Sequence, residues 1–366
     1  MKILYWTDFF LPWIGGIETF SMDLIPALQA RGHEVTVVTS FHKSNLPAVE
    51  DLGSIRVHRF PMWGAIRAND LRGLVAVTRA ITALKRELRP DVTHLHFGAT
   101  SYFHLQTRTA VSAPTLTTVH ALPESSLGED SLFTKAVHTS RAVNTVSARA
   151  HQVLSRAYPG VVDRLSFVYY GLAPLQSTME VVSPSFDEPL ILCLGRLTPQ
   201  KGFDLAVKAF ARIQQTVPKA RLVIVGEGVE ESALKQLAAT LGIEEKVDFP
   251  GPVLPQDVYR VMNRATMVLL PSRFEGLPLV ALQAAKMQRP IISSAVDGLP
   301  ELIVDHESGL VLKDNNEVEL GRAILALVQN PEAAIAMGKA VAKRFEERFG
   351  FDHCVSQYER LYHQIA

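Results

Sequence analysis

The chain alternates between short runs of apolar, often β-branched residues and longer stretches in which apolar residues recur with helical spacing. Nearly continuous apolar runs are typical of parallel strands, because helices cover both faces of a parallel sheet. Strands that alternate with helices predict βαβ units and an α/β fold. The expected strands cover residues 2–6, 34–40, 54–60, 91–97, 114–120, 141–147 and 165–171 in the first half, and 190–197, 220–228, 246–251, 265–272, 290–295 and 308–313 in the second.

Two helices of the first half are clear from their pattern. Residues 17–31 form an amphipathic stretch that ends at Gly32, and glycine often follows the last residue of a helix. Residues 71–88 form a second amphipathic stretch, which is rich in arginine. The pattern therefore predicts helices in both places.

Residues 172–189 interrupt the strand and helix pattern. The segment contains prolines and scattered polar residues with no regular spacing, which is typical of a linker. A chain of 366 residues is long enough for two domains of ordinary size. We therefore expect two Rossmann-like domains, residues 1–171 and 190–349. Ligands of such sheets bind where the carboxyl ends of the strands lead into loops.

Composition excludes several classes of protein. Lysine plus arginine and aspartate plus glutamate number 37 each, so the chain lacks the basic excess typical of nucleic-acid-binding proteins. The two cysteines, Cys193 and Cys354, do not form a disulfide framework or a C-x-x-C metal motif. They fit a reducing compartment. Asp8 interrupts the first apolar run, so no signal-peptide core is expected, nor is any membrane-spanning run. These features predict a cytoplasmic protein.

Three strand ends of the first half carry candidate chemistry. Gly15 and Gly16 precede the first helix, where the backbone can approach an anionic ligand. The dinucleotide fingerprint G-x-G-x-x-G is absent, which disfavours a nicotinamide-dependent dehydrogenase. His120 ends an expected strand and is a candidate site residue. His94 and His96 are interpreted as pointing to opposite faces of their strand, so they are not expected to bind one metal ion.

Two strand ends of the second half carry charged residues. Arg196 and Lys201 lie between a strand and a helix, where two cations suit a diphosphate and stabilise the charge that develops when it leaves. Glu275 follows the strand at 265–272, and Pro278 is expected at the first position of the next helix. Gln283 comes eight residues after Glu275, which would return it to nearly the same helical face. The two side chains could therefore grip one elongated polar ligand.

Taken in order, these segments resemble the retaining glycosyltransferases of family 4, which have the GT-B fold of two Rossmann-like domains with parallel sheets. The resemblance covers nearly the whole chain, and its last helix, at about 350–366, is similar to one that crosses back onto the N-terminal domain in the family. The matching segments are Gly15–Gly16, His120, GRLTPQKG from 195, VGEG from 225, FPGPV from 249, PSRFEGLPLVALQA from 271 and DGLPELI from 297.

The resemblance implies a nucleotide-diphosphate sugar donor, retention of configuration and no requirement for a metal or other cofactor. The N-terminal domain would hold the acceptor and the C-terminal domain the donor. The implied roles are donor diphosphate binding by Arg196 and Lys201, sugar hydroxyl binding by Glu275, a sugar contact near the reacting centre by His120, phosphate and acceptor contacts by Gly15 and Gly16, backbone contacts by Gly276, Leu277, Leu279 and Val280, and a base contact by the backbone at Val253.

Two positions depart from the family pattern. Gln283 stands where the family usually has a second glutamate, which binds the ribose of the nucleotide. An amide can still donate and accept hydrogen bonds, although it carries no charge. Tyr170 stands where the family often has asparagine, next to Gly171.

The acceptor is less constrained by the sequence. Residues 66–89 combine six basic residues with an apolar stripe, which suits either contact with an anionic membrane at its inner face or a covering helix with a solvated surface. Residues 122–133 are polar and acidic and are expected to form a mobile acceptor loop. The expected acceptors are glycans, glycoconjugates or small molecules.

Three functions fit these observations. The favoured function is a hexosyltransferase. The first alternative is a catalytically weak sugar-nucleotide-binding protein that acts as a partner subunit, which Gln283 keeps open. The second is another GT-B enzyme such as a sugar-nucleotide epimerase, which would need a further acid and base beyond His120.

Overall fold

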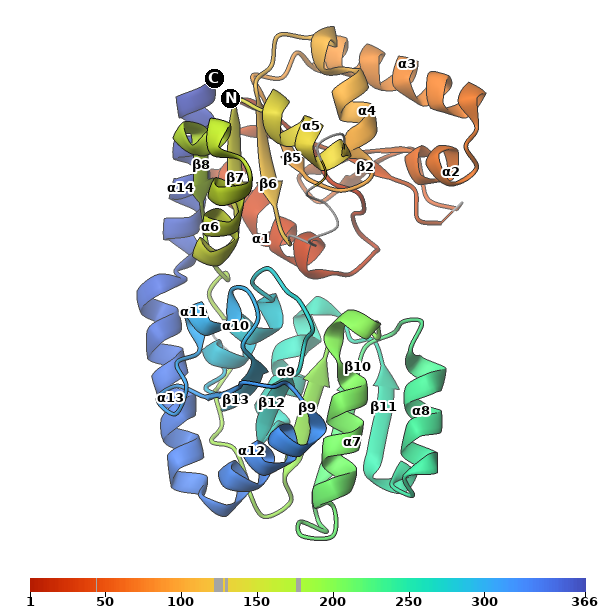
Figure 1. Ribbon diagram of the computed structural model, residues 1–366. Helices are drawn as coiled ribbons and strands as arrows, with labels where there is room; N and C mark the ends of the chain where they lie inside the picture. Colours follow the sequence, from red (N-terminus) through yellow and green to blue (C-terminus); the bar gives the residue numbers. More distant parts are fainter. Residues whose placement is uncertain (44, 122–127, 129–130, 176–178) are drawn as a thin grey trace. The chain divides into compact units, whose positions relative to one another are not determined.

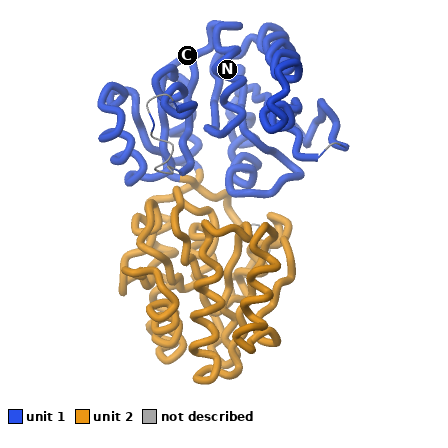
Figure 2. The backbone as a smooth tube through the Cα atoms, turned by 45° about the vertical axis from the view of Figure 1, so that its right-hand side comes forward, with its two compact units in different colours: residues 1–169, 352–366 blue, residues 170–351 orange. Residues whose placement is uncertain are grey.

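The computed structural model describes residues 1–43, 45–121, 128, 131–175 and 179–366. The chain forms two compact units, shown in different colours in Figure 2. Unit 1 comprises Met1–Tyr169 and Asp352–Ala366, and unit 2 comprises Tyr170–Phe351. Most of the expected acceptor loop, residues 122–127 and 129–130, lies outside the described residues. Within the described part, no helix is both long and apolar enough to cross a membrane.

Unit 1 is built on an eight-stranded sheet with the order β3-β4-β2-β1-β5-β6-β7-β8. All neighbouring strands are parallel except β3 and β4. The strand order reverses between β1 and β5, the kind of position where doubly wound sheets bind ligands. The strands are β1 (Lys2–Trp6), β2 (Glu34–Ser40), β3 (Val49–Leu52), β4 (Ile55–Phe60), β5 (Val92–His96), β6 (Thr115–Val119), β7 (Ala142–Thr145) and β8 (Leu165–Phe167).

The sequence pattern did not predict β3. This strand pairs antiparallel with β4 at the edge of the sheet. Its residues are Val-Glu-Asp-Leu, and all of them are at least partly exposed. Edge strands carry charged side chains and need no apolar run, so β3 lacks the signal by which the buried strands are predicted.

Helices cover the sheet of unit 1 (Figure 1). Helix α3 begins after Asp70, whose side chain accepts a hydrogen bond from the backbone N–H of Arg72. It packs Val77, Ile81 and Leu84 into the core against β1 and β5. The helices are α1 (Gly16–Ala30), α2 (Met62–Arg67), α3 (Leu71–Leu88), α4 (Ser101–Gln106), α5 (Leu132–Thr139), α6 (Ala148–Ala157) and α14 (Phe351–Ile365).

The C-terminal helix α14 is held against unit 1 by polar contacts. The hydroxyl of Tyr362 lies 2.8 Å from Nδ1 of the buried His94 on β5. Glu359 accepts a hydrogen bond from Arg31 at 3.0 Å and lies 3.0 Å from Nε2 of His33. These contacts join the last residues of the chain to segments more than 250 positions earlier.

Unit 2 contains a six-stranded parallel sheet with the order β11-β10-β9-β12-β13-β14. This is the Rossmann order, and it reverses between β9 and β12. The strands are β9 (Leu190–Leu194), β10 (Arg221–Val225), β11 (Val247–Gly251), β12 (Met267–Leu270), β13 (Ile291–Ser294) and β14 (Leu310–Leu312).

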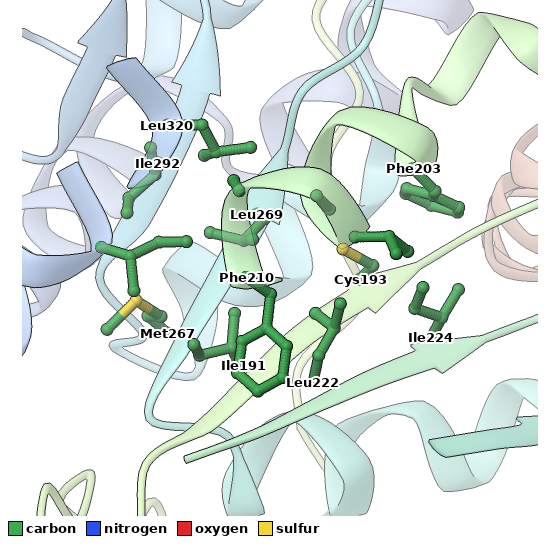
Figure 3. Close-up of a cluster of buried hydrophobic side chains, with 14 of the residues drawn as sticks. Ile191, Cys193, Phe203, Phe210, Leu222, Ile224, Met267, Leu269, Ile292 and Leu320 are labelled. Atoms are coloured by element: carbon green, nitrogen blue, oxygen red, sulfur yellow. The ribbon is translucent and has the colours of Figure 1, made fainter. Parts of the chain in front are cut away.

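Side chains from the sheet of unit 2 and from its covering helices interlock in one apolar core. Figure 3 shows Phe203 and Phe210 of α7 against Ile191 and Cys193 of β9. The thiol of Cys193 is fully buried in this core. The helices are α7 (Phe203–Ile213), α8 (Glu231–Thr240), α9 (Val258–Arg264), α10 (Leu279–Lys286), α11 (Leu299–Leu302), α12 (Glu317–Gln329) and α13 (Pro331–Arg348).

One basic residue of the amphipathic helix α3 points into the core of unit 1. Lys85 is 1% exposed, and its Nζ lies 3.3 Å from Nδ1 of His104 and 3.4 Å from the carbonyl oxygen of Thr107. Nζ also lies 5.5 Å from the ring centre of Trp6. Desolvation lowers the pKa of Lys85 to about 7. Lys85 therefore does not contribute to the basic surface of the helix.

We expect this burial to make the stability of unit 1 depend on pH. An unfolded lysine has a pKa near 10.5, so between about pH 7 and 10.5 the unfolded state binds the proton that the folded state lacks. Stability should rise with pH in this window, by about 1 kcal/mol per pH unit. Lys85→Met should remove this slope. The measurement is urea unfolding at pH 7, 8 and 9, followed by tryptophan fluorescence.

The exposed Arg86 on the same helix provides a matched control. Arg86→Met should keep the slope of the wild type. Equal slopes in Lys85→Met and the wild type would contradict the prediction.

Candidate active site

The candidate site of unit 2 lies at the point where its strand order reverses. Lys201 ends the short 3-10 helix Pro199–Lys201, which follows β9. Glu275 lies in the loop that follows β12. Because β9 and β12 are parallel neighbours, their carboxyl ends bring the two loops together.

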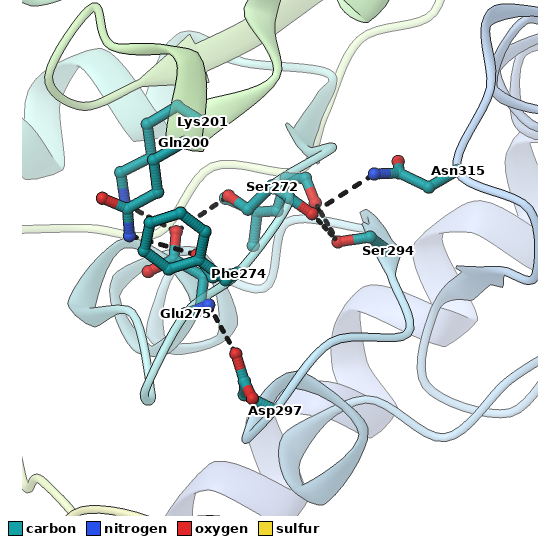
Figure 4. Close-up of polar contacts among 9 residues, drawn as sticks. Gln200, Lys201, Ser272, Phe274, Glu275, Ser294, Asp297 and Asn315 are labelled. Carbon is teal, nitrogen blue, oxygen red and sulfur yellow. Dashed lines mark hydrogen bonds and ion pairs between the residues drawn. The ribbon is translucent and has the colours of Figure 1, made fainter. Parts of the chain in front are cut away.

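The two residues form an ion pair (Figure 4). Nζ of Lys201 donates to Oε1 of Glu275 at 2.6 Å, and the hydroxyl of Ser272 donates to the same oxygen at 2.8 Å. Glu275 is 7% exposed. Its backbone N–H donates to Oδ2 of Asp297 at 2.6 Å. The structure therefore brings together two residues that the sequence analysis placed in separate motifs. It adds Ser272 and Asp297, which lie in the matching segments from 271 and 297 but were not predicted as site residues.

Hydrogen bonds to backbone carbonyls join the two loops to each other and to the end of β13. The backbone N–H of Arg273 donates to the carbonyl of Gln200 at 2.8 Å, and the side chain of Gln200 donates to the carbonyl of Phe274 at 3.1 Å. The hydroxyl of Ser294, at the end of β13, donates to the carbonyl of Ser272 at 2.7 Å. These bonds fix the position of Glu275 before any ligand arrives.

At the carboxyl edge of the unit 2 sheet, two glycines allow backbone segments to pack closely. Gly202 has φ +65°, and a Cβ there would collide with the carbonyl oxygen of Pro271. Gly226 has φ +140°, and a Cβ there would collide with the carbonyl oxygen of Gly195. Both positions therefore require glycine, for conformation as well as for space.

The other predicted residues of unit 2 occupy the same edge or its neighbours. Arg196 follows β9 and is exposed, with no hydrogen bond or ion pair from its side chain to any residue the structure describes. Val253 lies in the loop after β11. Gly276, Leu277 and Leu279 are buried, and the carbonyl of Gly276 accepts a hydrogen bond from Gly298 at 2.9 Å.

The start of α10 differs from the prediction. Pro278 is not the first helical residue but the N-cap, with an extended ψ of 127°, and the helix begins at Leu279. Glu275 therefore lies in the loop, and the helical spacing expected between Glu275 and Gln283 does not apply. Gln283 is 5% exposed, and its side chain makes no hydrogen bond within the described chain.

The candidate site of unit 1 lies around its own reversal point. Gly15 is the extended N-cap of α1, and Gly16 is the first helical residue. A Cβ at Gly15 would contact the carboxylate of the buried Glu18, which is the end of a flexible side chain and can shift. The first turn of α1, whose N–H groups have no acceptor within the helix, begins directly after this loop.

His94 and His96 correct one prediction. Residues two apart on a strand share a face, so the expectation that they point to opposite faces was wrong. Their ring centres are 4.1 Å apart. Both rings are buried, and Nδ1 of His96 lies 2.7 Å from Nε2 of His120. His120 is thus held by a buried histidine that the sequence analysis did not recognise as part of the site.

Burial keeps these three histidines neutral. Desolvation lowers the pKa of His120 to about 3 and lowers the pKa values of His94 and His96 well below 6.5. Nε2 of His96 is buried without a hydrogen-bond partner among the residues described. An orphaned lone pair costs less than an orphaned N–H, so we infer that His96 carries its proton on Nδ1 and donates it to His120. His120 then carries its own proton on Nδ1.

Family comparisons divide the chain as its two units do. Residues 14–173 match the family model described as Glycosyltransferase Family 4, and residues 178–344 match the model described as Glycosyl transferases group 1. A glycogen synthase from Mycobacterium tuberculosis is 25% identical over 377 residues, which cover 95% of this chain and 91% of that protein.

Solved structures share the fold. A sucrose-phosphate synthase from Thermosynechococcus elongatus superposes with a TM-score of 0.85 at 23% identity, over 99% of this chain and 98% of the other. The Anabaena protein HepE, in complex with UDP and glucose, superposes with a TM-score of 0.77 at 17% identity over all of both chains. Both are two-domain GT-B proteins in fold, as this chain is.

We expect His120 to stay neutral across the physiological range. Because desolvation sets its pKa to about 3, the nitrogen-15 shifts of its ring should not change between pH 5 and 8 and should report the Nδ1–H tautomer. The measurement is long-range proton–nitrogen NMR, with His120→Asn to assign the signals. A titration of His120 with a midpoint in that range would contradict the prediction.

Proposed function

Because the chain belongs to the family 4 glycosyltransferases and has their GT-B fold, we propose that it transfers a hexose from a nucleotide-diphosphate sugar to a carbohydrate-containing or small-molecule acceptor with retention of configuration. The observation that carries this proposal is the pairing of Lys201 with Glu275 at the reversal point of unit 2. One member of the pair suits the phosphates of the donor and the other suits its sugar.

The cations hold the donor diphosphate. Arg196 is exposed with no partner among the described residues, so it is available to the phosphates. Lys201 has three N–H donors and uses one for Glu275. As the bond to the sugar breaks, negative charge builds on the diphosphate, and the two cations stabilise that charge. The proposal therefore needs no metal ion.

Glu275 holds the donor sugar. Its Oε1 already accepts from Lys201 and Ser272, whereas Oε2 has no hydrogen bond with a described residue. Oε2 is thus the acceptor for a sugar hydroxyl. The bond from the Glu275 backbone to Asp297 orients the loop so that this oxygen is presented in one direction.

Backbone groups and Gln283 complete the donor site. The first N–H groups of α10, at Leu279 and Val280, lack helical partners and favour an anion. Gln283 binds the ribose through its amide, with the oxygen accepting and the nitrogen donating. The backbone near Val253 contacts the base. The HepE structure in complex with UDP and glucose supports a nucleotide donor of this kind.

Unit 1 contributes neutral groups to the reaction. In this proposal His120, positioned by His96, contacts the transferred sugar, and the Gly15–Gly16 loop contacts the phosphate and the acceptor. A neutral donor binds a hydroxyl without adding charge near the reacting centre. This division assigns the acceptor to unit 1 and the donor to unit 2.

We also propose peripheral contact with an anionic membrane through residues 66–89. On α3, Leu71 is 74% exposed and Val75 is 50% exposed, one helical turn apart. Arg72, Arg79 and Arg86 are exposed around them. Apolar side chains flanked by arginine suit the boundary between lipid headgroups and acyl chains. The buried Lys85 takes no part.

We expect Lys201→Ala and Glu275→Ala each to lower kcat/KM by about 100-fold or more, because each removes a charged contact to the transferring group. The pair is buried enough that the remaining partner is also left unpaired. The measurement is initial-rate kinetics with the donor found by thermal shift across nucleotide sugars in a chelator.

Exposed residues of unit 2 supply the matched controls. Lys208→Ala and Glu231→Ala remove surface charges whose ion pairs, among the residues described, are with neighbours on the same helix, and both should keep normal kinetics. Unchanged turnover in both site variants would refute the site assignment. Donor binding with no turnover on any acceptor would instead favour a sugar-nucleotide-binding subunit.

We expect the protein to bind phosphatidylglycerol vesicles but not phosphatidylcholine vesicles, and to do so less at high salt. Arg72→Glu combined with Arg79→Glu should weaken binding at least tenfold in a flotation assay. Lys339→Glu, at an exposed position of unit 2, should leave it unchanged. Equal binding by the double variant and the wild type would exclude α3 as the contact.

A further inference from the structure

Aromatic side chains gather at one edge of the unit 1 sheet. Phe9 follows β1, His42 follows β2, and Trp63 lies in α2, directly after β4. Trp13 lies in the loop between β1 and α1. Because β1, β2 and β4 are neighbouring parallel strands, their carboxyl ends meet at the edge where doubly wound sheets bind ligands. We call these four residues the aromatic cluster.

The rings of the aromatic cluster form a continuous stack. The ring centre of Phe9 is 5.0 Å from that of Trp13 and 5.7 Å from that of Trp63, with the Phe9 and Trp63 planes within 4° of parallel. The guanidinium of Arg67 lies 5.0 Å above the Trp63 ring and closes that end. His42 meets Trp13 edge-on at 5.7 Å. Trp13, which is 36% exposed, is the open end of the stack.

A buried arginine holds the loop that carries Trp13. The side chain of Arg59, at 0% exposure, donates to the carbonyl oxygen of Leu11 at 2.8 Å and to that of Pro47 at 3.2 Å. It also forms an ion pair with Glu50 at 2.7 Å. The exposed indole is therefore carried on an anchored backbone, which lowers the entropy lost when a ligand binds.

The cluster contains polar atoms that have no partner. Both ring nitrogens of His42 and Nε1 of Trp63 are buried without a hydrogen bond to any residue in the described chain. Desolvation, with Lys43 and Arg59, lowers the pKa of His42, so its neutral ring offers one donor and one acceptor. Buried polar groups in folded proteins are nearly always paired, so this cluster lacks hydrogen-bonding groups that a ligand or its bound water would supply.

We propose that the aromatic cluster is a carbohydrate-binding platform on which a pyranose ring of the acceptor stacks against Trp13. A pyranose has an apolar face for the indole and hydroxyl groups at its rim for the unpaired nitrogens and Arg67. A lipid chain would leave those nitrogens unsatisfied. Nε1 of Trp13 would lie only 3.8 Å from a Cβ at Gly15, which places the platform beside the glycine loop. In its acceptor role, this inference rests on the proposed function.

Tryptophan fluorescence provides a direct test. The chain has three tryptophans, of which Trp13 and Trp63 belong to the cluster. Trp6 is fully buried, with its Nε1 bonded to Thr100 at 3.0 Å. Titration with maltotriose, and with methyl glycosides of glucose, galactose, mannose and N-acetylglucosamine up to 100 mM, should give a saturable change for at least one saccharide.

The matched variants separate the platform from general effects on the fold. Trp13→Ala should weaken the response at least about tenfold, because truncation of an exposed tryptophan removes the main stacking surface. Phe167→Ala removes another exposed aromatic residue, on β8 rather than at the cluster, and should keep the response. Circular dichroism confirms folding of both variants.

Three results would overturn the proposal. These are no saturable change with any of these saccharides, a full response in Trp13→Ala, or a blue shift with phosphatidylglycerol vesicles and none with saccharides, which would assign the cluster to membrane contact. The thermal stabilisation that nucleotide sugars produce through the proposed donor site of unit 2 is measured in parallel. No stabilisation of the wild type by any nucleotide sugar would count against the proposed function, whereas normal stabilisation without a saccharide response refutes only the platform.

Discussion

The direction of the strands is the constraint on which both units depend. In each core sheet the neighbouring strands run parallel, apart from β3 at one edge. All carboxyl ends of a unit therefore meet at one edge, and each crossover places a loop there. The order reverses between β1 and β5 and again between β9 and β12, so two loops diverge and leave room for a ligand. Gly15 and Gly16 follow the first of these strands, and Lys201 and Glu275 follow the second pair.

Much of this fold could be predicted because burial on both faces leaves a strong signal. Runs such as Leu-Ile-Leu-Cys-Leu in β9 are apolar throughout, as a strand between two layers of helices must be. Helix α3 was predicted at its observed bounds because its apolar residues repeat with helical spacing. The sequence pattern did not predict the edge strand β3, because its side chains are at least partly exposed and form no apolar run. The start of α10 was misplaced because Pro278 is compatible with both the N-cap and the first turn.

The site was predictable only where its residues lie in recognisable motifs. Lys201 and Glu275 are 74 positions apart, and nothing local indicates that they form an ion pair. Asp297 binds the backbone of Glu275 from a third loop, so its role depends wholly on tertiary structure. His96 is different, since correct use of the two-residue strand period would have placed it beside His94. Its contact with His120 then follows from the parallel pairing of β5 and β6.

The candidate sites of the two units differ in the charge of their buried side chains. The Lys201 and Glu275 pair is largely shielded from water, so the diphosphate proposed for this site would compete for Lys201 where charges interact strongly. Gln283 adds no negative charge to this unit, which would reduce repulsion of the phosphates in the proposed site. In unit 1, desolvation holds His94, His96 and His120 neutral, and the aromatic cluster adds apolar surface. A net charge does not strengthen the binding of a neutral sugar. Fixed hydrogen-bonding groups bind its hydroxyl groups, and flat apolar side chains bind the apolar face of its ring. The buried groups of unit 2 therefore suit the phosphates of a donor, because they are charged. Those of unit 1 suit the hydroxyl groups of a sugar, because they are neutral.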